Sequence, residues 1–213
     1  MYSRNKEWQG IPILIKDNID SLGLANTAGS LSMLDNFPRR DAHLVTKLKK
    51  SGFLVVGKAN LSEWANFRGR NSVSGWSSYG GQTRNPYNLD YNPCGSSSGS
   101  AAAVALGLVP VSIGTETNGS ITCPASINGV VGIKPTVGLV SRHGIIPISS
   151  TQDTAGPMAR NVYDAAVVLK TISGKDPKDK ATSKIPSNFD FSGLVNLNSK
   201  FLKGKRIGLI LPS

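Results

Sequence analysis

Two serines in glycine-rich segments are the residues of this chain whose types and spacing best fit catalysis. Ser96 lies in the run CGSSSGS at residues 94–100, and Ser120 lies in GTETNGSI at residues 114–121. A serine becomes a nucleophile only where the backbone turns sharply around it, where main-chain N–H groups face the developing oxyanion, and where a base lies within hydrogen-bond reach. Glycines allow the first two conditions, so both segments are candidates for acyl-transfer chemistry.

Lys16 is the candidate base. It follows the short apolar run Ile11–Ile15, which is bounded by Gly10 and predicts a buried strand that delivers the lysine at its end. A lysine accepts a proton only in its neutral form, and burial at the end of an apolar strand lowers the pKa of the amine towards the operating pH.

Several segments, in order along the chain, resemble the amidase signature family, whose members cleave amides with a Ser–Ser–Lys triad. The resemblance runs from about Gly10 to Arg160. Besides the two serine segments, it is carried by residues 10–17 (GIPILIKD), 57–65 (GKANLSEWA), 85–90 (NPYNLD), 132–136 (GIKPT) and 153–160 (DTAGPMAR). Each segment is a weak signal alone, whereas the ordered set is specific.

This resemblance implies that Ser120 is the nucleophile, Ser96 the bridging serine and Lys16 the base. Neutral Lys16 draws the proton of Ser96 while Ser96 draws that of Ser120, and the family's counterpart of Ser96 sits at a cis peptide bond. The implied oxyanion donors are the N–H groups of Thr117, Asn118, Gly119 and Ser120. Relatives commonly carry Gly or Asp at the position of Asn118, so we expect the turn to persist and the polarity of the acyl pocket to differ.

The function implied is hydrolysis of non-peptide or terminal amides through an acyl-enzyme, with a small-molecule amide as substrate and with neither cofactor nor metal. One alternative is the glutaminase subunit of glutamyl-tRNA amidotransferase, which usually has an arginine where Thr122 stands here. Another is a catalytically incomplete fragment that acts as a binding or scaffold piece, because only 15 residues precede Lys16 and the resemblance ends near Arg160.

A different hydrolase reading rests on residues 95–99, which match G-x-S-x-G and would make Ser97 the nucleophile of an α/β-hydrolase. In an α/β-hydrolase a hydrophobic strand precedes this motif, whereas the polar run YNPC precedes it here. Only one histidine, His143, follows it. The Ser–Ser–Lys reading is therefore favoured.

The composition excludes other classes. Cys94 and Cys123 are the only cysteines, and we expect them to be small packing residues beside the serine segments rather than a disulfide. No His/Cys/Asp cluster has metal-ligand spacing. The formal net charge of +11 is concentrated between Lys170 and Arg206, where the sequence has nine cations and three aspartates but no aromatic stacking platform interleaved with the lysines. This pattern predicts a solvated linker and no specific nucleic-acid binding.

Alternating strand and helix patterns predict an α/β layer fold. The family resemblance implies a mixed β-sheet covered by helices on both faces, incomplete in this chain. The expected strands are 11–15, 53–56, 109–113, 130–133 and 207–211, and the expected helices are 41–50, one from about Asn60 through Trp64 and Phe67, 100–106, and one from Val162 to near Gly174. Residues 71–92 are expected to form a long loop.

The expected organisation is a catalytic core at 1–173, a polar basic linker at 174–205, and the start of a further strand at 206–213. No apolar stretch is long enough for a membrane helix and the start of the chain has no signal-peptide pattern, so a cytoplasmic protein is expected. A sheet without its remaining partners predicts self-association. It also predicts an open pocket that leaves Lys16 hydrated and charged, and hence a poor enzyme.

Overall fold

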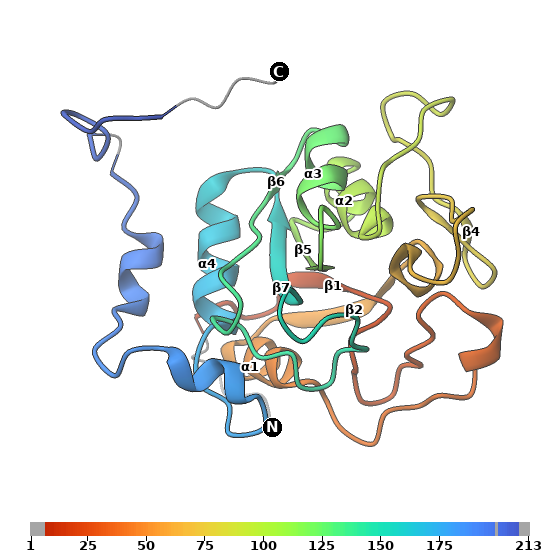
Figure 1. Ribbon diagram of the computed structural model, residues 1–213, viewed down its shortest axis with the longest axis horizontal. Coiled ribbons are helices and arrows are strands. Elements are labelled where there is room, and N and C mark those ends of the chain that lie inside the picture. The colour runs from red at the N-terminus through yellow and green to blue at the C-terminus, as the bar shows by residue number, and fades with distance from the viewer. Residues whose placement is uncertain (1–6, 199, 209–213) are drawn as a thin grey trace.

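A five-stranded sheet forms the centre of the computed structural model, which describes residues 7–198 and 200–208 (Figure 1). The strand order is β2-β1-β5-β7-β6, with β1 at Pro12–Lys16, β2 at Leu54–Ala59, β5 at Val111–Glu116, β6 at Val131–Gly132 and β7 at Thr154–Ala159. Strand β1 pairs in parallel with β2 and β5, whereas β7 pairs antiparallel with β5 and β6. The carboxyl ends of β1 and β5 therefore meet at one edge of the sheet.

Helices cover both faces of this mixed sheet, which confirms the expected fold class (Figure 1). Helices α1 (His43–Ser51) and α4 (Val162–Ile172) enclose the larger core on one face, where Ile13, Ile15 and Ile113 are fully buried. Helices α2 (Ser98–Ala105) and α3 (Thr122–Ile127) cover the other face with mostly small side chains. Except for the 60–67 helix and the 207–211 strand, the expected elements are confirmed, with ends displaced by a few residues.

Residues 60–67 do not form the expected helix. They contain a 3-10 turn, Glu63–Asn66, in which Trp64 and Ala65 have left-handed backbones with φ of 50° and 54°. The Glu63 carboxylate accepts a hydrogen bond from Ser78 N–H at 2.7 Å and pairs with Arg68. Long-range contacts have overridden the local pattern.

Strand β7 is not among the expected strands, because its sequence TAGPMA contains glycine and proline, which disfavour strands. All six residues are nevertheless buried. A side chain at Gly156 would collide with the carbonyl of Ile133, so the glycine is required for this close approach. The proline has no N–H to donate, and its carbonyl accepts from Ile133 N–H at 3.0 Å.

The long loop contains a short antiparallel hairpin of β3 (Trp76–Ser77) and β4 (Gly81–Gln82). Within the predicted linker, two 3-10 turns occur at Lys180–Lys184 and Phe191–Val195. Asp176, Asp179 and Thr182 of this segment are buried, and the Asp179 carboxylate forms an ion pair with Arg142 at 2.7 Å. The segment's first residues therefore pack onto the core. The predicted strand 207–211 lies mostly outside the described residues.

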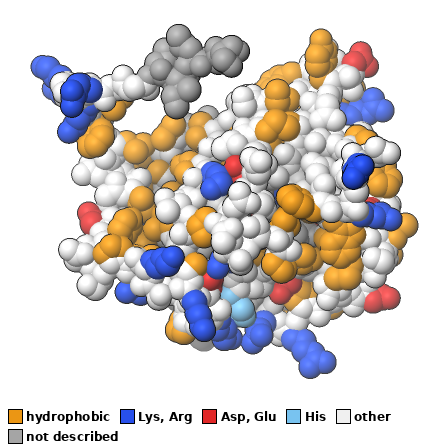
Figure 2. Space-filling view, viewed as in Figure 1, with side chains coloured by type: hydrophobic (Ala, Val, Ile, Leu, Met, Phe, Trp, Pro, Cys, Tyr) orange, Lys and Arg blue, Asp and Glu red, His pale blue; other side chains and the backbone are white. Residues whose placement is uncertain are grey.

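The surface shows no single basic patch on the face in Figure 2, where lysine and arginine side chains are scattered among other types and one group marks the C-terminal segment. Along residues 7–198 and 200–208, no helix has the length and apolar character needed to cross a bilayer.

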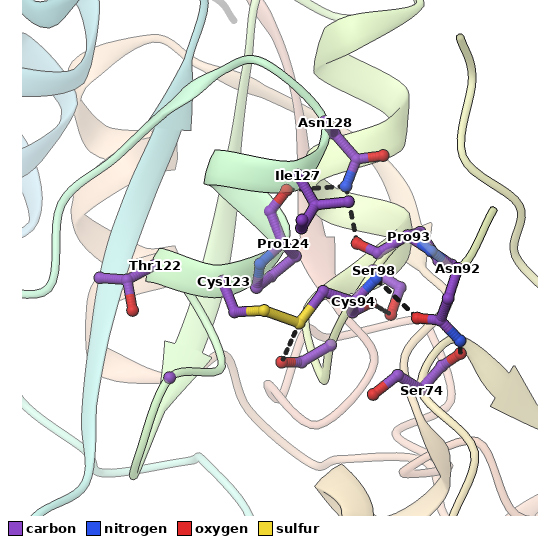
Figure 3. The surroundings of a disulfide bond; sticks show 12 residues. Ser74, Asn92, Pro93, Cys94, Ser98, Thr122, Cys123, Pro124, Ile127 and Asn128 are labelled. Carbon is purple, nitrogen blue, oxygen red and sulfur yellow. Dashed lines mark hydrogen bonds between the residues drawn. A yellow bond between two sulfur atoms is a disulfide. The ribbon is translucent and has the colours of Figure 1, made fainter. Parts of the chain in front are cut away.

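The cysteines correct the sequence-based expectation, because Cys94 and Cys123 form a disulfide (Figure 3). Their Cα atoms are 5.9 Å apart, and the bond joins the loop before α2 to the first turn of α3. The Asn128 side chain reinforces this junction by donating to the Pro93 carbonyl at 2.8 Å. Two cysteines 29 residues apart carry no local signal of this proximity, which comes from the packing of the two serine segments.

Removing the disulfide should lower the free energy of unfolding. A cross-link that closes a loop of 29 residues restricts the unfolded chain, which corresponds to about 3 to 4 kcal/mol in the chain-entropy model. Urea unfolding of Cys94→Ala/Cys123→Ala and of the reduced wild type should show the same loss. Adding a reductant to the double variant should change nothing, and equal stability of the oxidised and reduced wild type would contradict the assignment.

Candidate active site

Lys16 lies at the end of β1, with its side chain fully buried. Its Nζ donates hydrogen bonds to Ser96 Oγ at 2.7 Å and to the Thr115 carbonyl at 3.1 Å. The parallel pairing of β1 with β5 brings Thr115 to the lysine, since the two strands end at the same edge. The structure therefore brings two of the three predicted catalytic residues into direct contact.

The environment of Lys16 lowers the pKa of its amine to about 7. Burial is the main cause, because desolvation penalises the ammonium form. The carboxylates of Glu116 and Asp153 act in the opposite direction and moderate the shift. The expectation that an open pocket leaves this lysine hydrated is thus wrong for this chain, because its own strands and loops exclude water from the amine.

Ser96 is also fully buried and follows a cis peptide bond from Gly95, as the family resemblance implies. Its carbonyl accepts from Ser62 N–H at 3.0 Å, which attaches the loop to the segment after β2. The loop is therefore held by its backbone while its hydroxyl faces the lysine.

Ser120 lies in the turn between β5 and α3 and is 8% exposed. Its carbonyl accepts from Ser97 N–H at 3.1 Å, so the residue after Ser96 is bonded directly to the backbone of the predicted nucleophile. This contact and the disulfide hold the two serine segments side by side.

Ser97 has a different environment from that required of an α/β-hydrolase nucleophile. Its hydroxyl is fully buried, donates to the Thr115 carbonyl at 3.1 Å and accepts from Thr115 N–H at 3.2 Å. The side chain connects the start of α2 to β5, so its place in the fold is that of a structural link.

Glu116 is a site residue that the sequence reasoning missed. Its carboxylate is 5% exposed and accepts hydrogen bonds from the N–H groups of Gly119, Ile121 and Thr122 at 2.9, 2.7 and 2.9 Å. These backbone bonds outweigh desolvation and lower the pKa of the carboxyl group. The available signal was an acidic residue at the end of an apolar strand, four positions before the serine.

The predicted oxyanion donors are not equivalent. Gly119 N–H is directed to Glu116 Oε1, whereas the N–H groups of Thr117, Asn118 and Ser120 have no acceptor within the part of the chain that the structure describes. The hydroxyl of Thr117 donates to Asp153 at 2.6 Å. Three of the four predicted donor N–H groups are thus without a protein acceptor in the described part of the chain.

A cavity of about 280 Å³ lies against the end of β5 and is lined by Thr115–Thr117, Asn18, residues 142 and 143 and residues 145–150 among others. Asp153 holds one wall of the cavity in place, because the Asp153 carboxylate accepts hydrogen bonds from the N–H groups of Ile148 and Ser149 at 2.7 and 2.8 Å. The arrangement combines a low-pKa amine, two hydroxyl groups, free N–H donors and a neighbouring cavity. Such a site can support nucleophilic acyl transfer.

The chain is similar to solved and curated proteins. The chain is 61% identical to the solved native peptide amidase of Stenotrophomonas maltophilia, with a TM-score of 0.83 over 86% of this chain and 38% of that one. It is 42% identical to a solved subunit of the glutamyl-tRNA(Gln) amidotransferase of Thermotoga maritima, with a TM-score of 0.74 over 84% of this chain and 39% of that one.

A probable amidase of Arabidopsis thaliana is 51% identical over 205 residues, which are 95% of this chain and 40% of the relative. The chain thus spans about two fifths of the length of these relatives. The model of the Amidase family matches residues 3–212. This match extends over almost all of the chain, which therefore belongs to the amidase family.

Proposed function

We propose that the chain carries the catalytic residues of an amide hydrolase that acts through an acyl-enzyme on Ser120. The observation that carries the proposal is the buried hydrogen bond of 2.7 Å from Lys16 to Ser96, made by an amine whose pKa is about 7. A buried amine of this pKa is neutral in a large fraction of molecules at neutral pH and can serve as a base.

In the proposed reaction, Lys16 takes the proton of Ser96 while Ser96 takes that of Ser120, whose oxygen attacks the amide carbonyl. The N–H groups of Asn118 and Ser120 stabilise the oxyanion, and because the fold already holds them in place they need no reorganisation. The proton returns through the same relay to the leaving nitrogen, and the C–N bond breaks. Water then hydrolyses the ester on Ser120 by the reverse relay.

We favour a stand-alone amidase, with terminal amides as its substrate class. Two observations support this choice. The sequence identity to a peptide amidase, 61%, is higher than that to the amidotransferase subunit, 42%, and Thr122 stands at the position where that kind of subunit usually has arginine.

The Cys94–Cys123 disulfide favours an oxidising compartment over the cytoplasm, because disulfides persist mainly in oxidising environments.

Substitution of any one of the three residues should impair covalent reaction with a fluorophosphonate. Ser120→Ala removes the bond-forming oxygen and should give no adduct, while Ser96→Ala and Lys16→Ala should slow labelling by about 10²- to 10⁴-fold, since each breaks the proton relay. Mass spectrometry should locate the adduct on Ser120. The control is Ser126→Ala, an exposed serine on α3. An adduct on Ser97 would contradict the assignment.

The labelling rate should rise with pH through about 7. The active form is the neutral amine, so the rate increases as Lys16 loses its proton and reaches a plateau above its pKa. Lys16→Arg, which stays protonated throughout the accessible range, should be slow at every pH. A rate that peaks below about pH 5, where the ammonium form of the lysine dominates, would be incompatible with this base.

The second candidate, the glutaminase component of a glutamyl-tRNA amidotransferase, is kept because the chain is 42% identical to a subunit of such an enzyme. We expect only weak association with tRNA that falls steeply with salt, because non-specific phosphate contacts release counterions. Titration at several salt concentrations measures this. Tight binding that persists at about 0.2 M salt would favour the amidotransferase reading.

A further inference from the structure

We propose that Glu116 is a positioning residue of this site, whose carboxylate shapes the turn that carries Ser120 and sets the charge around Lys16. This inference rests on the proposed function, since it concerns the same nucleophile and base. It assigns a role to a residue that lies outside the Ser–Ser–Lys set.

The Glu116 carboxylate fills the inside of the Ser120 turn. Oε1 accepts from Gly119 N–H at 2.9 Å, and Oε2 accepts from Ile121 N–H at 2.7 Å and Thr122 N–H at 2.9 Å. These donors lie on both sides of Ser120 in the chain. One side chain therefore fixes the backbone before and after the nucleophile.

Because the Glu116 carboxylate binds the Gly119 N–H group, it also determines which N–H groups of the turn remain available to a substrate oxygen. Gly119 has φ of 80°, a left-handed conformation that glycine adopts without strain, and its N–H is directed to the carboxylate. The neighbouring N–H groups of Asn118 and Ser120 find no acceptor among residues 7–198 and 200–208. Donors fixed in this way match the requirement for oxyanion stabilisation.

An amide cannot replace the carboxylate at Glu116. Both oxygens accept from backbone N–H groups, so a glutamine would direct its NH₂ group either at Gly119 N–H or at the pair from Ile121 and Thr122. Either choice places donor against donor and leaves at least one backbone N–H group of the turn without its partner. Glutamine is nearly isosteric, so this substitution tests the acceptor role separately from packing.

The second contribution of Glu116 is its charge. The charged groups that act on Lys16 are the carboxylates of Glu116, at the end of β5, and Asp153, before β7. Both favour the ammonium form, while the hydrogen-bond partners of the amine, Ser96 Oγ and the Thr115 carbonyl, are neutral. Loss of one carboxylate should therefore lower the pKa of Lys16 further.

The experiment measures the rate of fluorophosphonate labelling of Ser120 against pH in the full chain and in three variants. Glu116→Gln should lower the plateau at least about tenfold and move the midpoint of the profile to lower pH. Glu116→Asp keeps the charge but shortens the reach, so its plateau should fall while its midpoint stays at the wild-type value. Circular dichroism of each variant confirms folding.

Glu63→Gln is the matched control. Glu63 is also a glutamate with 5% exposure whose carboxylate accepts from a backbone N–H, that of Ser78, and it contacts neither serine segment through that carboxylate. It should keep both the wild-type plateau and midpoint.

Two results would overturn the role of Glu116. One is a wild-type rate for Glu116→Gln at every pH, and the other is a lowered plateau with an unmoved midpoint. Failure of the proposed function would appear differently, as wild-type protein that is not labelled at Ser120.

Discussion

The burial of one amine is the constraint on which the rest of the site depends. A fully buried ammonium group is costly, so the fold must either pair Lys16 with a carboxylate or favour its neutral form. Here the contacts of Nζ are a hydroxyl and a carbonyl, and the carboxylates of Glu116 and Asp153 are not among its hydrogen-bond partners. A pKa of about 7 follows from this balance. The catalytic proposal requires such a lysine, because a solvated one would be protonated.

The architecture supplies this environment by bringing distant segments to one edge of the sheet. Parallel β1 and β5 deliver Lys16 and Thr115 together, while α2 and α3 place the two serine segments on the same side (Figure 1). The disulfide between Cys94 and Cys123 adds a covalent link between those segments (Figure 3), beside the main-chain hydrogen bond from Ser97 to Ser120. The site is therefore held by covalent and main-chain contacts, which leave its hydroxyl groups available for chemistry.

The sequence predicted the local features better than the long-range ones. Apolar runs located β1 and β5, because each signal lies within a few residues. The ordered motifs predicted Lys16 and Ser96, which the structure brings into contact, together with Ser120 as the nucleophile. The left-handed turn at Trp64 and the burial of the Gly-Pro strand β7 depend on partners far along the chain, such as Ser78 and Ile133. The disulfide and the role of Glu116 were missed for the same reason, since only the folded backbone brings their partners together.

The most direct test of the account is the pKa of Lys16 itself. An NMR titration that follows the Cε and Hε resonances of this side chain, assigned with Lys16→Arg, reports its protonation without relying on catalysis. The account predicts a midpoint at about 7, well below the value of about 10.4 for a free lysine. A midpoint near the free value would show that the amine stays protonated at neutral pH and would contradict its assignment as the base.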